Sequence, residues 1–174
     1  MRLFIAITLP PEVKKQLADY AGGIGALADR AKPTRRDNFH LTLAFLGDAL
    51  TEIEACAALS AVSGAPFKLY SDKPGVFKRG GGDIHWLGLK SSAELSALYA
   101  KVAAALADVG FKLENRPFSP HITLAREVRG FSKDAGPPPR FVIPVSALTL
   151  MNSEHIGGIL TYTPIYVKKL DNSV

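Results

Sequence analysis

The sequence is poor in cysteine and in histidine, and it has no long apolar segment. Its single cysteine, Cys56, excludes an internal disulfide, and the apolar helical pattern around it predicts a buried structural thiol. The apolar run near the N-terminus covers only residues 3–7, which is too short for a signal-peptide core or a membrane span. We therefore expect a cytoplasmic protein that has no membrane partner.

Charged residues are also sparse and scattered. They make up 21% of the 174 residues, against 47% hydrophobic residues, a balance that argues against disorder and supplies the core of one domain over residues 1–174. The net charge is +5, but the basic residues form small groups and no long run. This distribution favours an anionic partner such as nucleic acid, held in a lined cleft and not by a basic tail.

One short pattern occurs twice in the chain. Residues 39–47 contain His-Leu-Thr-Leu-Ala, and residues 120–126 contain His-Ile-Thr-Leu-Ala. The histidines of the two motifs, His40 and His121, lie nearly half the chain apart. The simplest explanation is a single site that two similar half-sites assemble.

The alternation of polar and apolar residues in each motif predicts a half-buried strand. The histidine and the threonine then share one face, whereas the opposite face carries Leu41, Leu43 and Phe45 in the first motif and Ile122 and Leu124 in the second. Residues two apart on a strand lie about 6.5–7 Å from each other. Each His-Thr pair therefore suits a phosphate group better than a single metal ion.

An isolated His-x-Thr pattern is ordinarily structural, because threonine is a good strand former and a lone histidine is commonly a surface or core residue. Two copies with the same apolar flanks favour a functional interpretation instead. The other histidines do not: His85 has no second ligand at zinc-type spacing and is expected to be structural, and His155 is expected to be solvated in a turn-rich segment, 152–158.

With several further segments, the paired motifs make the chain resemble the 2H phosphoesterase superfamily, most closely its RNA 2′,3′-cyclic phosphodiesterases, also called 2′-5′ RNA ligases. These segments are residues 2–10, Asn38-Phe39 before the first motif, Leu46-Gly47 after it, 86–89 and 116–120. The resemblance implies an α+β, duplicated bilobal fold. Two antiparallel sheets would form a V-shaped cleft, with helices packed outside and approximate twofold symmetry between the lobes.

Strand and helix signals outside the motifs agree with the α+β class. A helix is expected from Pro10 past Tyr20, and a second over residues 48–62 with Leu50, Ile53, Ala57 and Leu59 on its apolar side. The remaining predictions are a helix over 91–109, strands at 66–70, 84–89, 141–145 and 160–167, and a mobile loop between the first two of these strands.

The residues of the motifs suffice for acid–base chemistry without a metal or another cofactor. Opening a 2′,3′-cyclic phosphate requires one group that deprotonates water and one that protonates the departing ribose oxygen, and histidine titrates near neutral pH. The hydroxyls of Thr42 and Thr123 would donate hydrogen bonds to the non-bridging oxygens, each worth about 1.5–3 kcal/mol because the acceptor is charged. Arg126 could add a positive charge.

The resemblance also implies how the roles divide. His40 would be the proton donor to the 3′ oxygen and His121 the proton acceptor for water, which gives a 2′-phosphate product. The reverse reaction would join a cyclic phosphate to a 5′-hydroxyl through a 2′-5′ bond. The expected partner is an RNA with a 2′,3′-cyclic phosphate end, tRNA halves among the candidates, acted on by a monomer.

Two alternatives stay open at this point. The cleft of a noncatalytic module could hold a nucleotide or an RNA end, or a phosphodiesterase could act on a small cyclic nucleotide or an ADP-ribose cyclic phosphate. The sequence also leaves open whether six further side chains contact the substrate: Arg35, Arg36, Phe77, Lys78, Arg79 and Tyr162.

Overall fold

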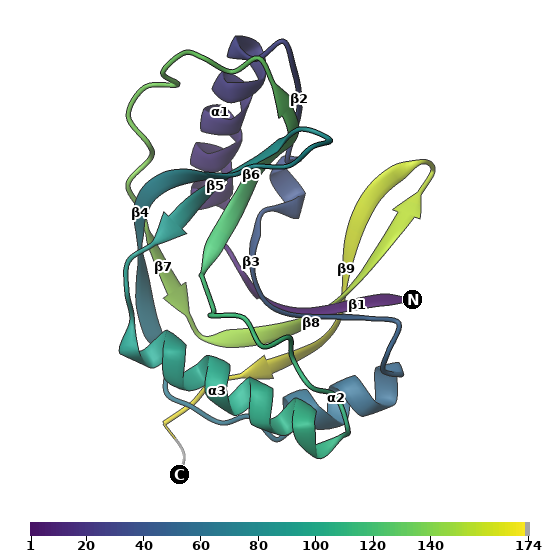
Figure 1. The fold of residues 1–174 in the computed structure, drawn as a ribbon. Helices are drawn as coiled ribbons and strands as arrows, with labels where there is room; N and C mark the ends of the chain where they lie inside the picture. The colour runs from purple at the N-terminus through teal and green to yellow at the C-terminus, as the bar shows by residue number, and fades with distance from the viewer. Residues whose placement is uncertain (173–174) are drawn as a thin grey trace.

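The computed structural model describes residues 1–172 and contains two antiparallel sheets (Figure 1). The strand order is β3-β1-β8-β9 in one sheet and β2-β6-β5-β4-β7 in the other. The strands are β1 (Arg2–Thr8), β2 (Arg30–Pro33), β3 (His40–Gly47), β4 (Phe67–Phe77), β5 (Asp83–Leu89), β6 (His121–Arg129), β7 (Val142–Val145), β8 (Ala147–Ile156) and β9 (Ile159–Lys169). The helices are α1 (Pro11–Leu27), α2 (Glu52–Ser60) and α3 (Ala93–Asp108), with a 3₁₀ turn, η1, at Arg36–Asn38. The predicted α+β class with two antiparallel sheets is confirmed.

The duplication extends beyond the motifs to the order of the elements. Each motif strand pairs with an earlier strand, and one α-helix lies between the two strands in the sequence. In this way β1-α1-β3 corresponds to β5-α3-β6. The sheet order β3-β1-β8-β9 likewise corresponds to β6-β5-β4-β7, with β2 added at the edge of β6. We call the first sheet and its motif lobe 1, and the second sheet and its motif lobe 2.

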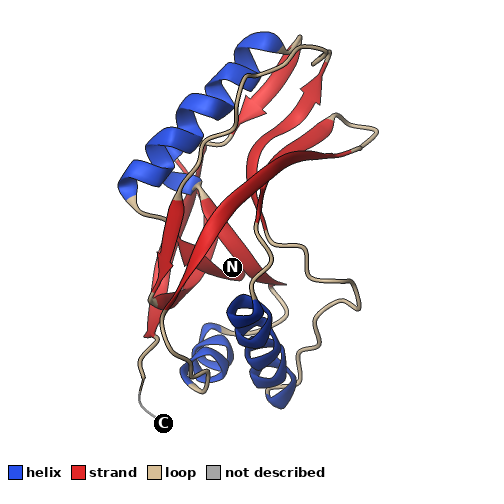
Figure 2. Cartoon of the chain, turned by 90° about the vertical axis from the view of Figure 1, so that its left-hand side faces the viewer, coloured by secondary structure: helices blue, strands red, loops and turns tan. Residues whose placement is uncertain are grey.

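The helices cover the outer sides of the sheets. Helix α1 begins with Pro11 at its first turn, where a missing N–H costs nothing, and it buries Val13, Leu17, Ala21 and Ile24. Although α1 follows β1 of lobe 1, it packs against β2 and β6 of lobe 2. Figure 2 shows α1 along the strands at one end of the molecule and the α2–α3 pair at the other. The lobes are thus tied together by a helix that crosses from one to the other.

Both motif strands carry a bulge at the same position. The β1–β3 register skips Leu43 and the β5–β6 register skips Leu124, so one extra residue interrupts the alternation in each motif. Phe45 was predicted to be buried with Leu43, but it is 68% exposed. The bulge is the physical reason, because it reverses which face the later residues occupy. Arg126, at the equivalent position of the second motif, is also exposed.

Helix α2 corrects a second prediction. It begins at Glu52 and not at Asp48, because Thr51 forms a capping box with Glu54. This later start changes the buried face: Ala55, Ala58 and Leu59 face the core, while Ile53 is 82% exposed and Ala57 is exposed as well. Helix α3 instead buries the predicted positions, Leu95, Leu98, Val102 and Leu106, and begins after its cap Ser92.

Several predicted loops are strands. Strand β4 continues through the stretch expected to be a mobile loop, and only residues 78–82 separate it from β5. Segment 152–158 was expected to be rich in turns, but residues 152–156 belong to β8 and the turn is Gly157-Gly158. His155 is exposed there, as expected for a solvated histidine. Strands β2 and β8 were not predicted, and they complete the sheets through pairing with distant strands.

Two further predictions concerned the single cysteine and the lack of a long apolar segment. Cys56 lies on α2 and is only partly buried, so the prediction of a buried thiol holds in part. Within residues 1–172, no helix combines the length and the apolarity that crossing a bilayer would require.

Candidate active site

His40 is the first residue of β3 and is held at both ring nitrogens. Its Nδ1 lies 2.7 Å from the carbonyl oxygen of Asn38, and its Nε2 lies 2.8 Å from Oγ1 of Thr42. Because a carbonyl can only accept, Nδ1 carries a proton and donates it. In the neutral ring Nε2 is then the acceptor of the Thr42 hydroxyl, and it is the nitrogen that can exchange a proton with a substrate.

His121, the first residue of β6, repeats this arrangement. Its Nδ1 lies 2.7 Å from the carbonyl oxygen of Ser119, which like Asn38 stands two residues before the histidine. Within residues 1–172 its Nε2 has no hydrogen-bond partner. In each half-site the hydrogen bond at Nδ1 therefore sets the tautomer and the orientation of the imidazole. Nε2 is then the nitrogen that can exchange a proton with a substrate.

Aromatic side chains from distant strands surround His40. The ring of Phe4 lies 4.9 Å from the imidazole centroid, and Tyr162 meets the imidazole edge-on at 5.1 Å. This burial is the main reason why the pKa of His40 lies below its ordinary value of 6.5, while the hydrogen bond to the Asn38 carbonyl opposes the shift.

Positive charges on β6 and on α1 act on the same imidazole. Arg126, Lys14 and His121 each lower the pKa of His40 further, because a positive charge nearby disfavours protonation. Arg126 also lowers the pKa of Tyr162, although burial raises that pKa overall. The motif strands β3 and β6 also lie in contact, so the two histidine motifs are near each other in the fold.

His121 has its own aromatic neighbours in lobe 2. Phe77 lies edge-on at 5.1 Å and Trp86 at 5.9 Å between ring centroids. The indole of Trp86 packs against Gly75, where an added Cβ would come within 2.1 Å of the ring, so only glycine permits this packing. The guanidinium of Arg79 lies 5.8 Å from the Phe77 ring centroid and extends the aromatic wall with a cation.

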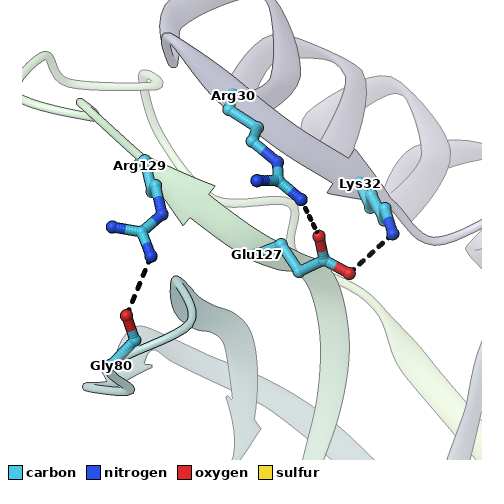
Figure 3. Close-up of polar contacts among 5 residues, drawn as sticks. All are labelled: Arg30, Lys32, Gly80, Glu127 and Arg129. Carbon is cyan, nitrogen blue, oxygen red and sulfur yellow. Dashed lines mark hydrogen bonds and ion pairs between the residues drawn. The ribbon is translucent and has the colours of Figure 1, made fainter.

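Arg126 is free to meet an anion, because the carboxylate beside it is already paired. Glu127 binds Arg30 and lies 2.6 Å from Lys32, both on β2, as Figure 3 shows. These bonds, the one to Lys32 first, hold the pKa of the Glu127 carboxyl below its usual range. Glu127 also has a φ of 51°, the only positive value at a non-glycine residue among those described. Within residues 1–172 Arg126 makes no ion pair or hydrogen bond.

The two threonines differ in what they bind. The hydroxyl of Thr42 is engaged with His40, whereas that of Thr123 has no hydrogen-bond partner within residues 1–172. The backbone carbonyl of Thr123 accepts a hydrogen bond of 2.9 Å from the Thr34 hydroxyl, which ties β6 to the segment before η1. Thr123 can therefore donate to a phosphate oxygen at once, and Thr42 can do so when His40 bonds elsewhere.

The six side chains that the sequence left open separate into two groups. Tyr162 contacts His40, and Phe77 contacts His121, with Arg79 against Phe77. The other three are bound elsewhere: Arg35 donates to the Leu160 carbonyl, Arg36 to the Pro11 carbonyl, and Lys78 pairs with Asp83 at 2.7 Å. Sequence reasoning gave Phe4, Asn38 and Trp86 only as parts of a resemblance and assigned none of them to the site. The one available signal for Phe4 was its place in the apolar run 3–7 near the N-terminus.

Comparisons with known proteins agree with this geometry. A family model described as the 2′-5′ RNA ligase superfamily matches residues 9–152. An RNA 2′,3′-cyclic phosphodiesterase of Escherichia coli is 34% identical over 94% of this chain and 93% of its own length. A protein of the same name from Geobacillus stearothermophilus is 38% identical over 73% of this chain, but the match covers only 42% of that relative.

Solved structures agree over nearly the whole chain. The apo crystal structure of E. coli LigT matches with a TM-score of 0.82 and 32% identity, over 98% of both chains. TT0787 of Thermus thermophilus matches with a TM-score of 0.80 and 28% identity, over 99% of this chain and all of that one. The resemblance inferred from the paired motifs is confirmed. This chain belongs to the 2′-5′ RNA ligase superfamily.

Proposed function

We propose that the protein is an RNA 2′,3′-cyclic phosphodiesterase, which hydrolyses a cyclic phosphate end to a 2′-phosphate. The observation that carries the proposal is the pair of imidazoles, His40 and His121, each fixed through Nδ1 to the carbonyl two residues before it and near enough for the charge of His121 to act on His40. The names of the relatives support it, and so do crystal structures of E. coli LigT with 3′-AMP and with phosphate.

The reaction follows from these positions. Nε2 of His121 takes a proton from water as the water oxygen attacks phosphorus, and the P–O3′ bond breaks on the opposite side. Nε2 of His40 gives its proton to the departing O3′, so the product keeps its phosphate on O2′. In-line displacement needs groups on two sides of phosphorus, which suits histidines on two lobes. Thr123, Thr42 and Arg126 would hold the non-bridging oxygens, each hydrogen bond being worth about 1.5–3 kcal/mol.

The low pKa of His40 is compatible with a role as proton donor. In the free protein, burial and the charge of Arg126 favour the neutral ring. A phosphate bound between Arg126 and His40 would offset the charge of Arg126 and attract a proton to Nε2. His40 would then gain its proton together with the substrate and release the Thr42 hydroxyl toward the phosphate.

Several finer points belong to the same proposal. The reverse reaction would join RNA ends through a 2′-5′ bond with the two histidines exchanging roles. The substrate would be an RNA end, tRNA halves included, and the protein would act as a cytoplasmic monomer, one domain over residues 1–174, without a cofactor.

Phosphorus NMR tests the proposal directly. An oligonucleotide with a 2′,3′-cyclic phosphate end is incubated in EDTA with the wild-type protein and, separately, with a protein that lacks both His40 and His121. The expected product is a 2′-monophosphate with the wild type alone. An unchanged but bound oligonucleotide would instead indicate the noncatalytic binding module, and a 3′-monophosphate would contradict the regiochemistry.

A further inference from the structure

A second cavity lies behind the sheet of lobe 2, on the side opposite His121. Its volume is about 580 Å³, within the range of about 300–1,000 Å³ that is usual for small-molecule sites. Its walls include Leu124 and Val128 of β6, whose side chains point away from the face that carries His121 and Thr123. Helix α1 and residues 130–135, which follow β6, close it from outside. The candidate active site therefore does not account for this cavity.

Two polar side chains that make no hydrogen bond within the described residues line the cavity. His85 is only 8% exposed, its ring meets Phe131 edge-on at 4.9 Å, and neither ring nitrogen has a hydrogen bond within residues 1–172. Burial lowers the pKa of His85, so the neutral ring offers one donor and one acceptor. Tyr20, which is partly buried, also lines the cavity, and its hydroxyl has no hydrogen-bond partner in the described part of the chain. Both side chains are therefore available to form hydrogen bonds with a ligand.

The charge around the cavity is positive. Four cationic side chains line it against two acidic ones: Lys78, Arg79, Arg129, Lys133, Asp83 and Asp134. The pair between Lys78 and Asp83, at 2.7 Å, neutralises one of each. Three cations then remain against a single carboxylate, and two of them, Arg79 and Arg129, also donate to the backbone carbonyls of Lys78 and Gly80. The net excess of two positive charges matches the charge of about −1.5 to −2 on a phosphate monoester.

We propose that this cavity binds a nucleotide, with the base against Phe131 and His85 and the phosphate toward Arg129 and Lys133. An aromatic wall with a donor and an acceptor suits a base, and a cationic rim suits a phosphate. The site goes beyond the proposed function. Its occupant is either a free mononucleotide or a nucleotide of the substrate strand, and only the second source rests on the proposed function.

The position of Arg79 supports the substrate strand as the source of the bound nucleotide. Arg79 lines the cavity and also lies over Phe77, whose ring contacts His121 in the candidate active site. The short turn between β4 and β5 thus lies between the two sites, and a single-stranded RNA could pass over this turn from one site to the other.

Equilibrium dialysis with adenosine 5′-monophosphate tests the site itself. The wild-type protein is expected to bind a second nucleotide beyond the one in the cleft, with a saturable shift of the His85 ring resonances in NMR. Lys133→Glu changes an exposed side chain and should weaken the second binding event by about tenfold or more. His85→Phe should abolish it, whereas His155→Phe, outside the cavity, should leave both events unchanged. A single nucleotide per chain with unmoved His85 resonances would overturn the proposal.

Turnover measurements identify the source of the nucleotide. If the substrate strand fills the cavity, Lys133→Glu lowers kcat/KM for an oligonucleotide with a cyclic phosphate end by about tenfold and leaves that for a 2′,3′-cyclic mononucleotide unchanged. If a free mononucleotide fills it, both rates stay the same while dialysis still detects the second site. Failure of the proposed function is distinguishable, because the wild-type protein would then turn over neither substrate, whatever the dialysis shows.

Discussion

The two lobes share their motif, its bulge and the bond that fixes its histidine, yet they differ in what surrounds that histidine. In lobe 1, His40 is buried against Phe4 and Tyr162, and Thr42 occupies its Nε2. In lobe 2, the Nε2 of His121 is unoccupied within the described residues. The position five residues after the histidine is Phe45 in lobe 1 and Arg126 in lobe 2.

This comparison shows how a duplicated half-site acquires two roles. In the proposed reaction, the shared features would present the Nε2 atoms of His40 and His121 to a common phosphate. The differences are that burial lowers the pKa of His40, that Thr42 occupies its Nε2, and that the free cation, Arg126, lies on lobe 2. Environment can assign acid and base roles to two identical side chains.

The largest expected effect comes from removing either imidazole. His40→Ala and His121→Ala should each lower kcat by about 10²–10⁴-fold with the fold intact, because each ring transfers a proton in the transition state. The measurement is steady-state hydrolysis of a 2′,3′-cyclic mononucleotide, with circular dichroism as a check on folding. His155→Ala, at the exposed end of β8, is the matched control and should retain full activity. Full activity in either motif variant would refute a role in catalysis for that lobe.

Making lobe 2 resemble lobe 1 at one position should have the next largest effect. Arg126→Phe removes the free cation and is expected to lower kcat/KM by about 10–100-fold, the value of one charged hydrogen bond. Because the charge of Arg126 lowers the pKa of His40, an NMR titration should also show that pKa rise in the variant. Phe45→Leu alters the equivalent position of lobe 1 and serves as the control. Equal losses from both variants would mean that the two positions do not differ in function.

The aromatic surroundings of His40 give a smaller effect with a definite sign. Tyr162→Ala exposes the imidazole, and since burial is the main cause of its low pKa, that pKa should rise toward 6.5. The same titration would show little change at His40 in Phe77→Ala, because Phe77 packs on His121 instead. A His40 pKa that responds equally to both changes would remove the distinction between the lobes.

Stability against pH should show the smallest effect. The pKa of His40 is lower in the folded protein than in the unfolded chain, so between these two values the unfolded chain binds more protons. The free energy of unfolding therefore falls as the pH decreases from 6.5 toward the folded pKa, and this contribution is constant above 6.5. Urea unfolding of the wild type and of His40→Asn should differ in that pH window. Parallel curves would show that burial of His40 does not affect its ionisation.

Sequence periodicity predicted the histidines and threonines of the site but not the bulge between them and Arg126. On a regular strand Arg126, three residues after Thr123, would point to the opposite face. The bulge at Leu124 brings it back to the side of the histidines, and the same device exposes Phe45. Bulges arise from pairing between strands, which a pattern along one strand does not encode.

Long-range packing explains the other misses. Phe4 and Tyr162 reach His40 from β1 and β9, and β9 is joined to β1 only through β8, which had no signal of its own. Local signals were dependable where local bonds decide the structure, as in α3. They failed at α2, where the capping box of Thr51 and Glu54 begins the helix at Glu52 and not at the predicted start, Asp48.

The assignment of His40 as the acid and His121 as the base is tested most directly by the pH dependence of kcat/KM in the two variants that each keep one of these histidines. When His121 is replaced by alanine, the remaining activity should depend only on protonated His40 and fall with rising pH, around a value below 6.5. When His40 is replaced, the remaining activity should depend on neutral His121 and rise with pH. If the two slopes were exchanged, His40 would be the base and His121 the acid, and if both variants kept the same profile, the lobes would not divide the chemistry between them.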